Sequence, residues 1–174
     1  MRMLTRMCTS LDGFVTTPDG RPVQVDYPAW DPEELGFYEL QSLCGAVLMG
    51  RSTFEPALYA PFWPWGDLPV YVLGSQFQPD LPAEVVVDSD PVRLYERLLE
   101  ECQDAAVHLV GGPLTVETYR RLGVLDELRL MVLPVLTGAG RQLTPGIGTD
   151  AVLSLIGIRD WPGGVTELAY EVEY

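Results

Sequence analysis

The stretch "AVLMGRSTFE", residues 46–55, passes from a buried strand into polar residues without a turn. Residues 46–49 are apolar and predict a short buried strand. Arg51, Ser52 and Thr53 follow Gly50 and precede a short helix that is expected to begin at about Thr53. A strand that leads directly into a helix is the repeating unit of an α/β fold. Arg51 then lies at the carboxyl end of a strand, where it either forms a surface ion pair or faces a ligand.

The composition indicates a single domain, residues 1–174, with a strongly acidic surface. Of the 174 residues, 47% are hydrophobic, which is enough for one compact core. The chain has 25 acidic residues, 11 basic residues that are all arginine, and a formal net charge of −14. Such a surface repels phosphodiester backbones and anionic lipids, so neither nucleic acid nor a membrane is an expected partner. An anionic small molecule can bind only where backbone amides or arginines create a positive potential.

The cysteines and the single histidine argue against disulfides and metals. Cys8, Cys44 and Cys102 are odd in number and lie in apolar surroundings, which is typical of reduced core thiols. With His108 as the only histidine, no metal site is expected. No apolar run is long enough to span a bilayer, and the stretch "MRMLTRMCTSLDG" is too polar for a signal sequence, so a cytoplasmic location is expected.

Strands and helices alternate along most of the chain. Strands are expected at residues 2–9, 46–49, 70–73, 84–87, 106–110, 127–136, 151–159 and 165–173. Helices are expected at residues 31–43 with Asp31 as the cap, from about residue 53, at residues 91–102, and at residues 113–122. The buried stripe of the third of these helices is expected to contain Val92, Tyr95, Leu99 and Cys102. This order predicts a three-layer α/β/α sandwich with antiparallel strands at the C-terminal end.

Glycines mark two of the predicted strand ends. Gly50 follows the strand at residues 46–49, and Gly111 and Gly112 follow the strand at residues 106–110. In an open α/β sheet, ligands bind beyond the carboxyl ends of the strands, and glycines there let a ligand approach the backbone. The amides of the next helix start favour an anion such as a dinucleotide pyrophosphate. The alternative is that the glycine pair only forms a tight turn.

Five stretches, taken in this order, resemble the dihydrofolate reductase superfamily. They are "TSLDGFV" (9–15), "VLMGRSTFE" (47–55), "VLGSQ" (72–76), "VHLVGGPLTVETYRRLGVLDELRLMVLPVLTGAGRQL" (107–143) and the closing hairpin. Within the superfamily, the chain is most similar to the reductase domain at the C-terminus of bacterial riboflavin-biosynthesis deaminase-reductases. The resemblance covers nearly the whole chain. It implies a dihydrofolate reductase-like fold with a mostly parallel central sheet of about eight strands.

The resemblance also implies a binding site for NADPH. Gly50, Arg51 and Thr53 match the Gly-Arg-x-Thr segment that grips the NADPH phosphates in dihydrofolate reductases, and this assigns Arg51 to the cofactor. Residues 73–76 match the loop on the adenosine side, and the glycine pair matches two glycines, joined by a cis peptide, beside the pyrophosphate and nicotinamide. The implied cofactor-binding residues are Gly50, Arg51, Ser52, Thr53, Leu73, Gly74, Ser75, Gln76, Val110, Gly111, Gly112, Pro113 and Leu114.

Hydride transfer to a ring also requires a proton donor. Counted back from Met49 without gaps, Glu34 falls where dihydrofolate reductases place the carboxylate that binds the pterin. Glu34 is also the third helical position after Asp31, where it would complete a capping box, and both roles stay open. Asp12, in the loop after the first strand, is either a second catalytic carboxylate or a turn-stabilising aspartate. His108 falls in the middle of a strand, which favours a structural role.

Departures from the family pattern leave the substrate open. Val110 replaces the glutamate that riboflavin reductases carry before the glycine pair, and Phe14 replaces a basic residue. Met131 replaces the hydroxyl residue that assists the carboxylate in dihydrofolate reductases, and Leu114 or Thr115 replaces a second cofactor arginine. The implied activity is NADPH-dependent hydride transfer to a pyrimidine- or pteridine-type ring, similar to that of 5-amino-6-(5-phosphoribosylamino)uracil reductase. The alternatives are dihydrofolate reductase activity and a non-catalytic module that binds NADPH.

Two further expectations concern loops and surfaces. The aromatic segment at residues 62–65 either forms a lid over a flat ring or packs beneath its own loop. The expected partners are a small-molecule substrate and a second copy of the chain, because family reductase domains commonly pair and the C-terminal strands carry more apolar side chains than one sheet face can bury. Those side chains are Leu128, Leu130, Val132, Leu153, Leu155 and Ile158.

Overall fold

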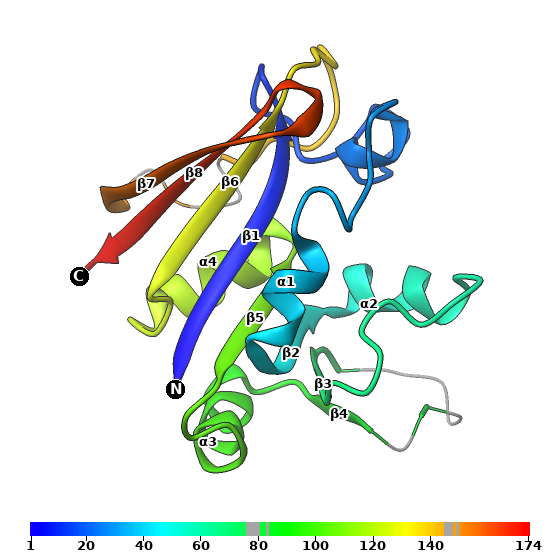
Figure 1. Ribbon diagram of the computed structural model, residues 1–174. Coiled ribbons are helices and arrows are strands. Elements are labelled where there is room, and N and C mark those ends of the chain that lie inside the picture. Colours follow the sequence, from blue (N-terminus) through cyan, green and yellow to red (C-terminus); the bar gives the residue numbers. More distant parts are fainter. Residues whose placement is uncertain (76–80, 83, 145–147, 149) are drawn as a thin grey trace.

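The structure is a computed structural model that describes residues 1–75, 81–82, 84–144, 148 and 150–174. Its strands are β1 (Arg2–Ser10), β2 (Cys44–Gly50), β3 (Val70–Leu73), β4 (Val85–Asp88), β5 (Ala106–Gly111), β6 (Glu127–Leu133), β7 (Val152–Trp161) and β8 (Val165–Glu173). Its helices are α1 (Phe37–Ser42), α2 (Arg51–Leu58), α3 (Pro91–Glu101) and α4 (Pro113–Arg121), with 3-10 turns η1 (Val23–Asp26) and η2 (Pro162–Gly164). Figure 1 shows how the helices are arranged around the sheet.

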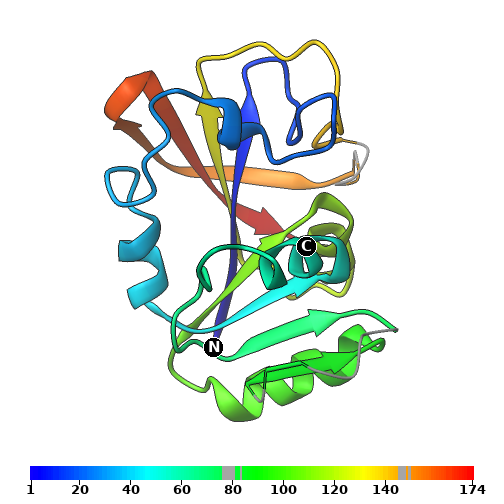
Figure 2. The same ribbon diagram turned by 90° about the vertical axis from the view of Figure 1, so that its right-hand side faces the viewer.

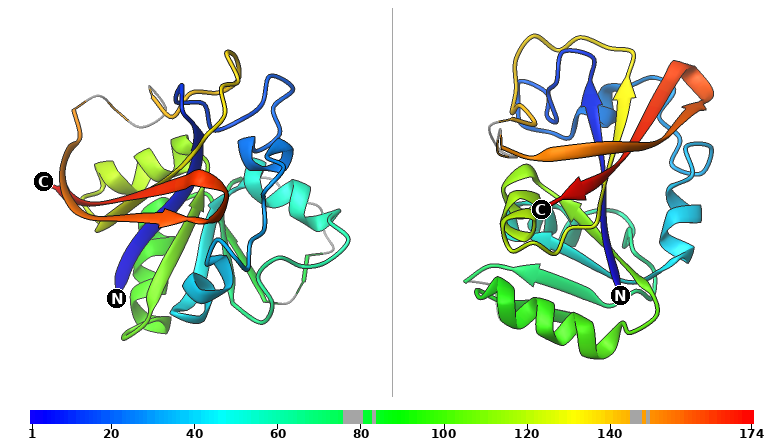
Figure 3. Two further views of the ribbon diagram at one scale, coloured as in Figure 1. Left: turned by 45° about the horizontal axis from the view of Figure 1, so that its top comes forward. Right: turned by 90° about the vertical axis from the view of Figure 1, so that its left-hand side faces the viewer.

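The sheet contains eight strands in the order β4-β3-β2-β5-β1-β6-β8-β7. Neighbouring strands are parallel from β4 to β6, whereas β8 is antiparallel to β6 and β7 is antiparallel to β8. The β7–β8 pair therefore forms one edge of the sheet (Figure 3). This arrangement confirms the mostly parallel sheet and the C-terminal antiparallel hairpin that the sequence predicts.

Successive residues of β2 point to opposite faces of the sheet and belong to two different cores. Leu48 packs in the same core as Leu98 of α3 and Tyr119 of α4. Val47 packs on the other face in the same core as Phe54 of α2. Because helices cover both faces of the sheet, β2 is apolar along its whole length, which is typical of a parallel strand. The helices on the two faces can be followed in Figure 2.

The first helix is shorter than the sequence predicts. It was expected over residues 31–43, but α1 begins at Phe37. Asp31 does cap a turn, because its Oδ1 accepts hydrogen bonds from the backbone N–H groups of Glu33 at 2.9 Å and Glu34 at 3.1 Å. Gly36 then takes a left-handed conformation with φ of 67° and becomes the N-cap of α1. The glycine therefore separates the capped turn from the helix.

The predicted start of α3 is confirmed, but part of its predicted buried stripe is wrong. The Asp90 side chain accepts a hydrogen bond from the backbone N–H of Val92 at 2.9 Å, so it is the N-cap. Leu94 and Leu98 are buried, whereas Val92 is 44% exposed and Leu99 is 41% exposed. The helix carries apolar residues on two adjacent stripes, and docking against the sheet selects the stripe that contains Leu94 and Leu98.

Two further observations concern the lengths of the strands and helices. The strand expected at residues 127–136 ends at Leu133, because Pro134 has no backbone N–H to donate to the sheet. Among the residues that the structure describes, the longest α-helix is α3, with 11 residues. No helix in the described ranges is long and apolar enough to cross a membrane.

Candidate active site

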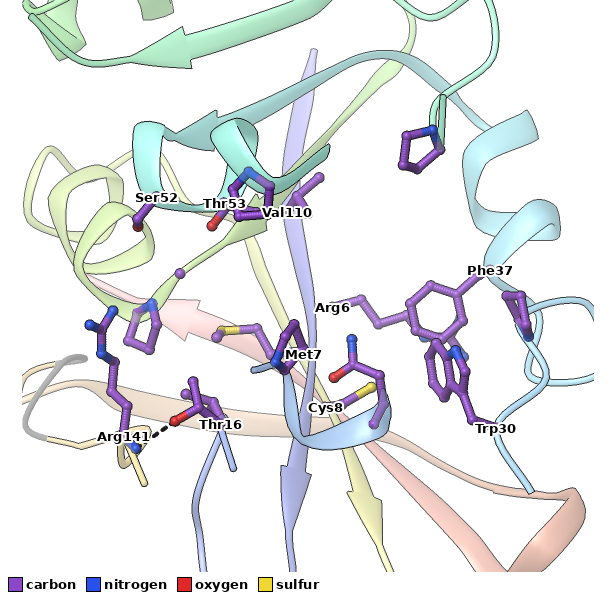
Figure 4. Close-up of a pocket in the computed structure, with 18 of the residues that line it drawn as sticks. Arg6, Met7, Cys8, Thr16, Trp30, Phe37, Ser52, Thr53, Val110 and Arg141 are labelled. Carbon is purple, nitrogen blue, oxygen red and sulfur yellow. Dashed lines mark hydrogen bonds between the residues drawn. The ribbon is translucent and has the colours of Figure 1, made fainter. Parts of the chain in front are cut away.

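A pocket lies at the carboxyl ends of the parallel strands (Figure 4). Its volume is about 980 Å³, at the upper end of the range for small-molecule sites. The starts of α2 and α4 form one end, and the aromatic rings of Trp30 and Phe37 form another. Arg6, Met7 and Cys8 of β1 lie between these two ends (Figure 4).

The starts of α2 and α4 contribute backbone groups to the same pocket. Ser52 and Thr53 in the first turn of α2 line it, as do Gly112 and Pro113 at the start of α4. The N-cap residues are Gly50 for α2 and Gly112 for α4, and neither helix start has a side-chain cap. The N–H groups of the first turn of α2 are therefore available to an anion, and the helix dipole favours negative charge there. At α4, Pro113 has no N–H and the N–H of Thr115 already donates to the backbone oxygen of Gly112 at 3.0 Å.

Gly50 and Gly112 are glycines for different reasons. A Cβ atom at Gly50 would overlap Oγ1 of Thr115, so the close packing of α4 against β2 requires glycine there. A Cβ atom at Gly112 would meet no heavy atom within 4 Å, and Gly112 lines the pocket. The Gly111–Gly112 peptide bond is cis, as the resemblance implies. Gly112 is thus the position where a missing side chain leaves room for a ligand against the backbone.

Most of the other residues implied to bind the cofactor do not line this pocket. Arg51 is half-exposed, and its Nε lies 3.5 Å from Oε1 of Glu55. Leu114 is 68% exposed. Leu73 is the last residue of β3, and neither it nor Gly74 and Ser75 after it line the pocket. Gln76 lies outside the described residues. The implied residues that the structure brings together in the pocket are Ser52, Thr53, Val110, Gly112 and Pro113.

Neither of the predicted catalytic carboxylates lines the pocket. Asp12 accepts hydrogen bonds from the backbone N–H groups of residues 137 and 138, at 3.2 and 2.8 Å. A hydrogen bond with the Ser10 side chain, followed by these backbone bonds, lowers the pKa of Asp12. These bonds tie the loop that contains Asp12 to the distant segment at residues 137–138, which is a structural role. Glu34 is exposed, and the lining contains no Asp or Glu among the residues whose positions are described.

Arg6 of β1 places a buried positive charge at the pocket. Its Nη1 donates to the backbone oxygen of Gly36 at 3.0 Å, and its Nη2 donates to Oε2 of Glu167 at 2.5 Å. Trp161 Nε1 donates to the same Glu167 oxygen at 2.9 Å. The guanidinium carbon lies 4.6 Å from the ring centroid of Phe37 and 5.0 Å from that of Trp161. Burial lowers the pKa of Arg6 and Glu167 acts against this, so the guanidinium stays charged.

His108 of β5 also lines the pocket and is uncharged. The imidazole is buried and its ring nitrogens make no well-formed hydrogen bond in the described part of the chain, although an interaction with the backbone of Arg6 acts to raise its pKa. Burial, followed by the charges of Arg6 and Arg129, lowers the pKa of His108 to about 4. Cys8 lies on the same lining, and burial raises the pKa of its thiol to about 12. No group of three or more metal-ligating side chains occurs among the described residues.

Aromatic side chains give the pocket an apolar wall. The ring centroids of Trp30 and Phe37 are 5.0 Å apart in an edge-to-face arrangement. Phe62 and Trp65 also line the pocket, with Phe62 exposed and Trp65 buried. Trp63 packs on Trp65 with a centroid distance of 5.0 Å. The segment at residues 62–65 therefore packs on itself and also contributes to the wall.

Sequence reasoning missed three residues of the lining or gave them another role. Arg6 carried a usable signal, because an arginine inside a buried strand requires a buried partner. His108 interrupts a buried strand in the same way, but the sequence favoured a structural role for it. Arg141 follows Gly140 near the end of the stretch 107–143, which carries the resemblance without giving Arg141 a role, and both residues line the pocket. None of the three was assigned to the pocket from the sequence.

The sheet order, together with the likeness to solved structures reported below, defines an α/β domain with a dihydrofolate reductase-like fold. The chain belongs to the RibD C-terminal domain family, whose model matches residues 3–166. This assignment confirms the resemblance to the reductase domain of the riboflavin-biosynthesis enzymes.

Two proteins of Bacillus subtilis are similar to this chain over most of their length. YyaP is 25% identical over an alignment of 183 residues in length, which covers 97% of this chain and 94% of YyaP. YwjB is 24% identical over 165 residues, which cover 94% of each chain.

Solved structures share the fold. A protein from Shewanella sp. PV-4, described as a riboflavin biosynthesis protein, has a TM-score of 0.80 and 20% identity, with 100% of both chains covered. A pyrimidine reductase-like protein from Corynebacterium diphtheriae has a TM-score of 0.72 and 17% identity, with 99% of this chain and 92% of that chain covered. The diaminohydroxyphosphoribosylaminopyrimidine deaminase/5-amino-6-(5-phosphoribosylamino)uracil reductase of Thermotoga maritima has a TM-score of 0.71 and 14% identity, with 99% of this chain and 56% of that chain covered.

Proposed function

We propose that this protein is an NADPH-dependent reductase that transfers a hydride to a pyrimidine- or pteridine-type substrate. Membership of the RibD C-terminal domain family supports a riboflavin-pathway reductase-like activity. The observation that carries the finer proposal is the composition of one pocket. It joins two helix starts without side-chain caps, at Ser52 and Gly112, to an aromatic wall beside Arg6.

The residues of the pocket fit a dinucleotide. Gly112 leaves open space where a side chain would stand, and the first turn of α2 offers backbone N–H groups beside it. We assign the cofactor phosphates to the amides of Ser52 and Thr53 and to Arg51, which exchanges its ion pair with Glu55 for the phosphate. NADPH bound there supplies the hydride. In a chain of net charge −14, these groups provide the local positive potential that an anionic cofactor needs.

The reduced ring also takes up a proton, and the lining supplies no strong acid. No carboxylate lines the described pocket, His108 is already neutral at pH 7, and burial raises the pKa of the Cys8 thiol to about 12. We therefore assign the proton to water that reaches the pocket, rather than to Glu34 or Asp12. The chain's own part is to orient the ring against the cofactor and to restrict the water around it.

A non-catalytic module that binds NADPH is the second candidate. The lack of a carboxylate on the described lining favours it, because acid–base groups contribute much of the rate of many reductions. The same observation speaks against dihydrofolate reductase activity, for which the resemblance requires a pterin-binding carboxylate at Glu34. Both candidates share the helix starts and Gly112, so they differ in turnover and not in cofactor binding.

One turnover assay separates the candidates. The protein is mixed with NADPH and, in turn, with dihydrofolate, dihydrobiopterin and aminouracil substrates, and the nicotinamide absorbance is followed. A reductase depletes the absorbance with a pyrimidine or pteridine. The binding module shows a higher melting temperature with NADPH but constant absorbance. If millimolar NADPH neither raises the melting temperature nor is consumed, both candidates are wrong.

A further inference from the structure

Arg141 carries a positive charge on the pocket wall that has no counter-charge in the described part of the chain. Its side chain is exposed, lines the pocket, and makes no ion pair or hydrogen bond with a described residue. Every other arginine of the chain lies 3.8 Å or less from a carboxylate. With 25 acidic and 11 basic residues, carboxylates are abundant, so the unpaired charge of Arg141 points to a ligand.

Hydrogen bonds to a second loop fix the backbone of Arg141. Its N–H donates to Oγ1 of Thr16 at 2.7 Å (Figure 4), and its carbonyl oxygen accepts from the backbone N–H of Val15 at 2.8 Å. Gly140 has a φ of 131°, and a Cβ atom there would lie 2.2 Å from the backbone oxygen of Thr16. The close approach of the two loops therefore requires glycine, and the Arg141 side chain projects from a fixed segment.

The segment that carries Arg141 packs beside α4. Val15 belongs to the same core as Val116 of α4, and Leu143 packs against this core. Within the pocket, Arg141 lies on the same side as Ser52 of α2 and away from the aromatic wall (Figure 4). Arg141 therefore faces the end of the pocket where the two helices begin.

The charges on the lining decide which ligand group fits this end. The charge of Arg6 is compensated, because its Nη2 lies 2.5 Å from Oε2 of Glu167. No Asp or Glu occurs among the described residues of the lining, and His108 is neutral. The start of α4 offers little to an anion, since Pro113 has no N–H. The uncompensated charge of Arg141 therefore favours an anionic group at this end.

We propose that Arg141 binds a phosphate of the cofactor and holds it against the first turn of α2. A guanidinium presents several N–H donors in a planar fork that matches a phosphate, and no described carboxylate competes for them. The amides of Ser52 and Thr53 contact the cofactor phosphates from one wall of the pocket, and Arg141 contacts them from the facing loop. The inference rests on the proposed function and adds a residue that determines how tightly the cofactor is held.

The test measures the dissociation constant of NADPH by calorimetry, without substrate, for four proteins. They are the wild type, Arg141→Gln, Arg141→Lys and Arg21→Gln. Arg21 is the matched control, because it is exposed and lies in the neighbouring loop but is not on the pocket lining. Its Nε lies 2.7 Å from Oδ2 of Asp19. The two glutamine variants remove the same charge from the molecule, and melting curves without NADPH check that each variant folds.

Arg141→Gln is expected to raise the dissociation constant about tenfold or more, because it removes charge-assisted hydrogen bonds to phosphate. Arg21→Gln should stay within about twofold of the wild type, because distant exposed charges are screened. Arg141→Lys keeps the charge but not the planar fork, so its dissociation constant should lie between those of the wild type and Arg141→Gln. Raising the salt concentration from about 50 to about 500 mM should weaken NADPH binding less in Arg141→Gln than in the wild type.

Two outcomes would overturn the assignment of Arg141 while the wild type binds NADPH. One is an unchanged dissociation constant in Arg141→Gln, and a KM for the substrate that rises alone would then place Arg141 against an anionic substrate. The other is an equal loss of affinity in Arg141→Gln and Arg21→Gln, which would show an effect of net charge and not of contact. In both cases the proposed function stands. If the wild type does not bind NADPH, the proposed function is wrong and the assignment of Arg141 falls with it.

Discussion

Arg51 is the first residue of α2, and its Nε lies 3.5 Å from Oε1 of Glu55. We expect Arg51→Ala to remove most of the rise in melting temperature that NADPH causes, because it removes a charged contact to phosphate. Without NADPH the variant should melt nearly as the wild type does, since exposed ion pairs contribute about 0–1 kcal/mol. Thermal scans with and without millimolar NADPH measure both effects.

Glu55→Gln is the matched control for this prediction. It frees Arg51 from its ion pair, so the NADPH-induced rise should be kept or should increase. An Arg51→Ala protein that gains as much stability from NADPH as the wild type would remove Arg51 from the cofactor site.

Glu34 and Asp12 are expected to act on stability rather than on turnover. Glu34→Gln should leave turnover within about twofold of the wild type, because its exposed side chain does not line the pocket. Asp12→Asn should lower the melting temperature, because the turn at residues 137–138 loses its charged acceptor. Steady-state assays with matched melting curves check both. A loss of roughly a hundredfold in turnover in either variant would restore that carboxylate as the acid.

Some residues of the candidate site could be identified from the sequence, and others could not. The cis glycine pair and Ser52 could be identified, because both belong to short local motifs. The role of Arg6 could not, because its partner Glu167 lies 161 residues away in the sequence. Glu34 was placed near the substrate site by counting back from Met49 without gaps. Its neighbours Pro32 and Phe37 line the pocket, but Glu34 itself does not.

At the scale of elements, an ion-pair cluster on α4 connects this helix to Gly148 and Asp150, which precede β7. Glu117 accepts from Arg120 Nε at 2.7 Å, from Arg121 Nε at 2.5 Å and from the backbone N–H of Gly148 at 2.9 Å. Arg120 is the main cause that lowers the pKa of Glu117 to about 2. An unfolded glutamate titrates at about 4.3. The cluster therefore joins the end of α4 to the segment that precedes β7.

This pKa difference predicts how stability depends on pH. Because the pKa of Glu117 is lower in the folded state, its contribution is complete above about pH 5 and is lost as the pH falls towards 2. Glu117→Gln should be less stable than the wild type at pH 7, and the difference should shrink progressively between pH 5 and pH 2. Urea unfolding at several pH values measures it. A difference that stays constant over this range would contradict the assigned pKa.

The starts and ends of helices and strands were predicted well where residues next to them in the sequence determine them. Asp90 and Pro91 start α3, and β3 covers the predicted residues 70–73. Errors occurred where tertiary packing selects between local alternatives. Gly36 shortened α1, and the sheet selected the Leu98 stripe of α3 rather than the one that contains Leu99.

At the scale of the whole molecule, β7 is an edge strand with an apolar surface. Val152, Leu155, Ile156 and Ile158 are each about half-exposed or more, whereas Leu128 of the predicted set is buried inside the subunit. We propose that a second copy of the chain covers this surface, because monomers rarely leave such an edge open. Light scattering at micromolar concentration should give the mass of a dimer.

A pair of substitutions tests where the copies meet. Ile158→Asp should shift the protein to a monomer, because it places a charge on the apolar surface of β7. Leu99→Asp, at an exposed position on α3, should remain dimeric. A wild type that is monomeric, or a dimer that survives Ile158→Asp, would contradict the proposed interface.

The pocket is a property of the whole molecule, because the sheet order brings its parts together. β1, β2 and β5 are neighbours in the sheet, although they are separated by long stretches of sequence. The sequence predicts the strand ends and the helix starts but not which side chains of the distant segments face them. This is why the glycines were found and why the wall of Arg6 and His108 was not.

The most direct test of the account is an NADPH titration of the wild type, Gly112→Ala and Gly157→Ala. A methyl group at Gly112 enters the open space that we assign to the cofactor, so the dissociation constant should rise about tenfold or more. Gly157 lies on β7, where a Cβ atom meets Ala169 at an ordinary 3.8 Å, and its variant should bind NADPH as the wild type does. Loss of affinity in Gly112→Ala alone is the predicted result. A wild type without measurable affinity, or equal affinities in all three proteins, would contradict the cofactor site.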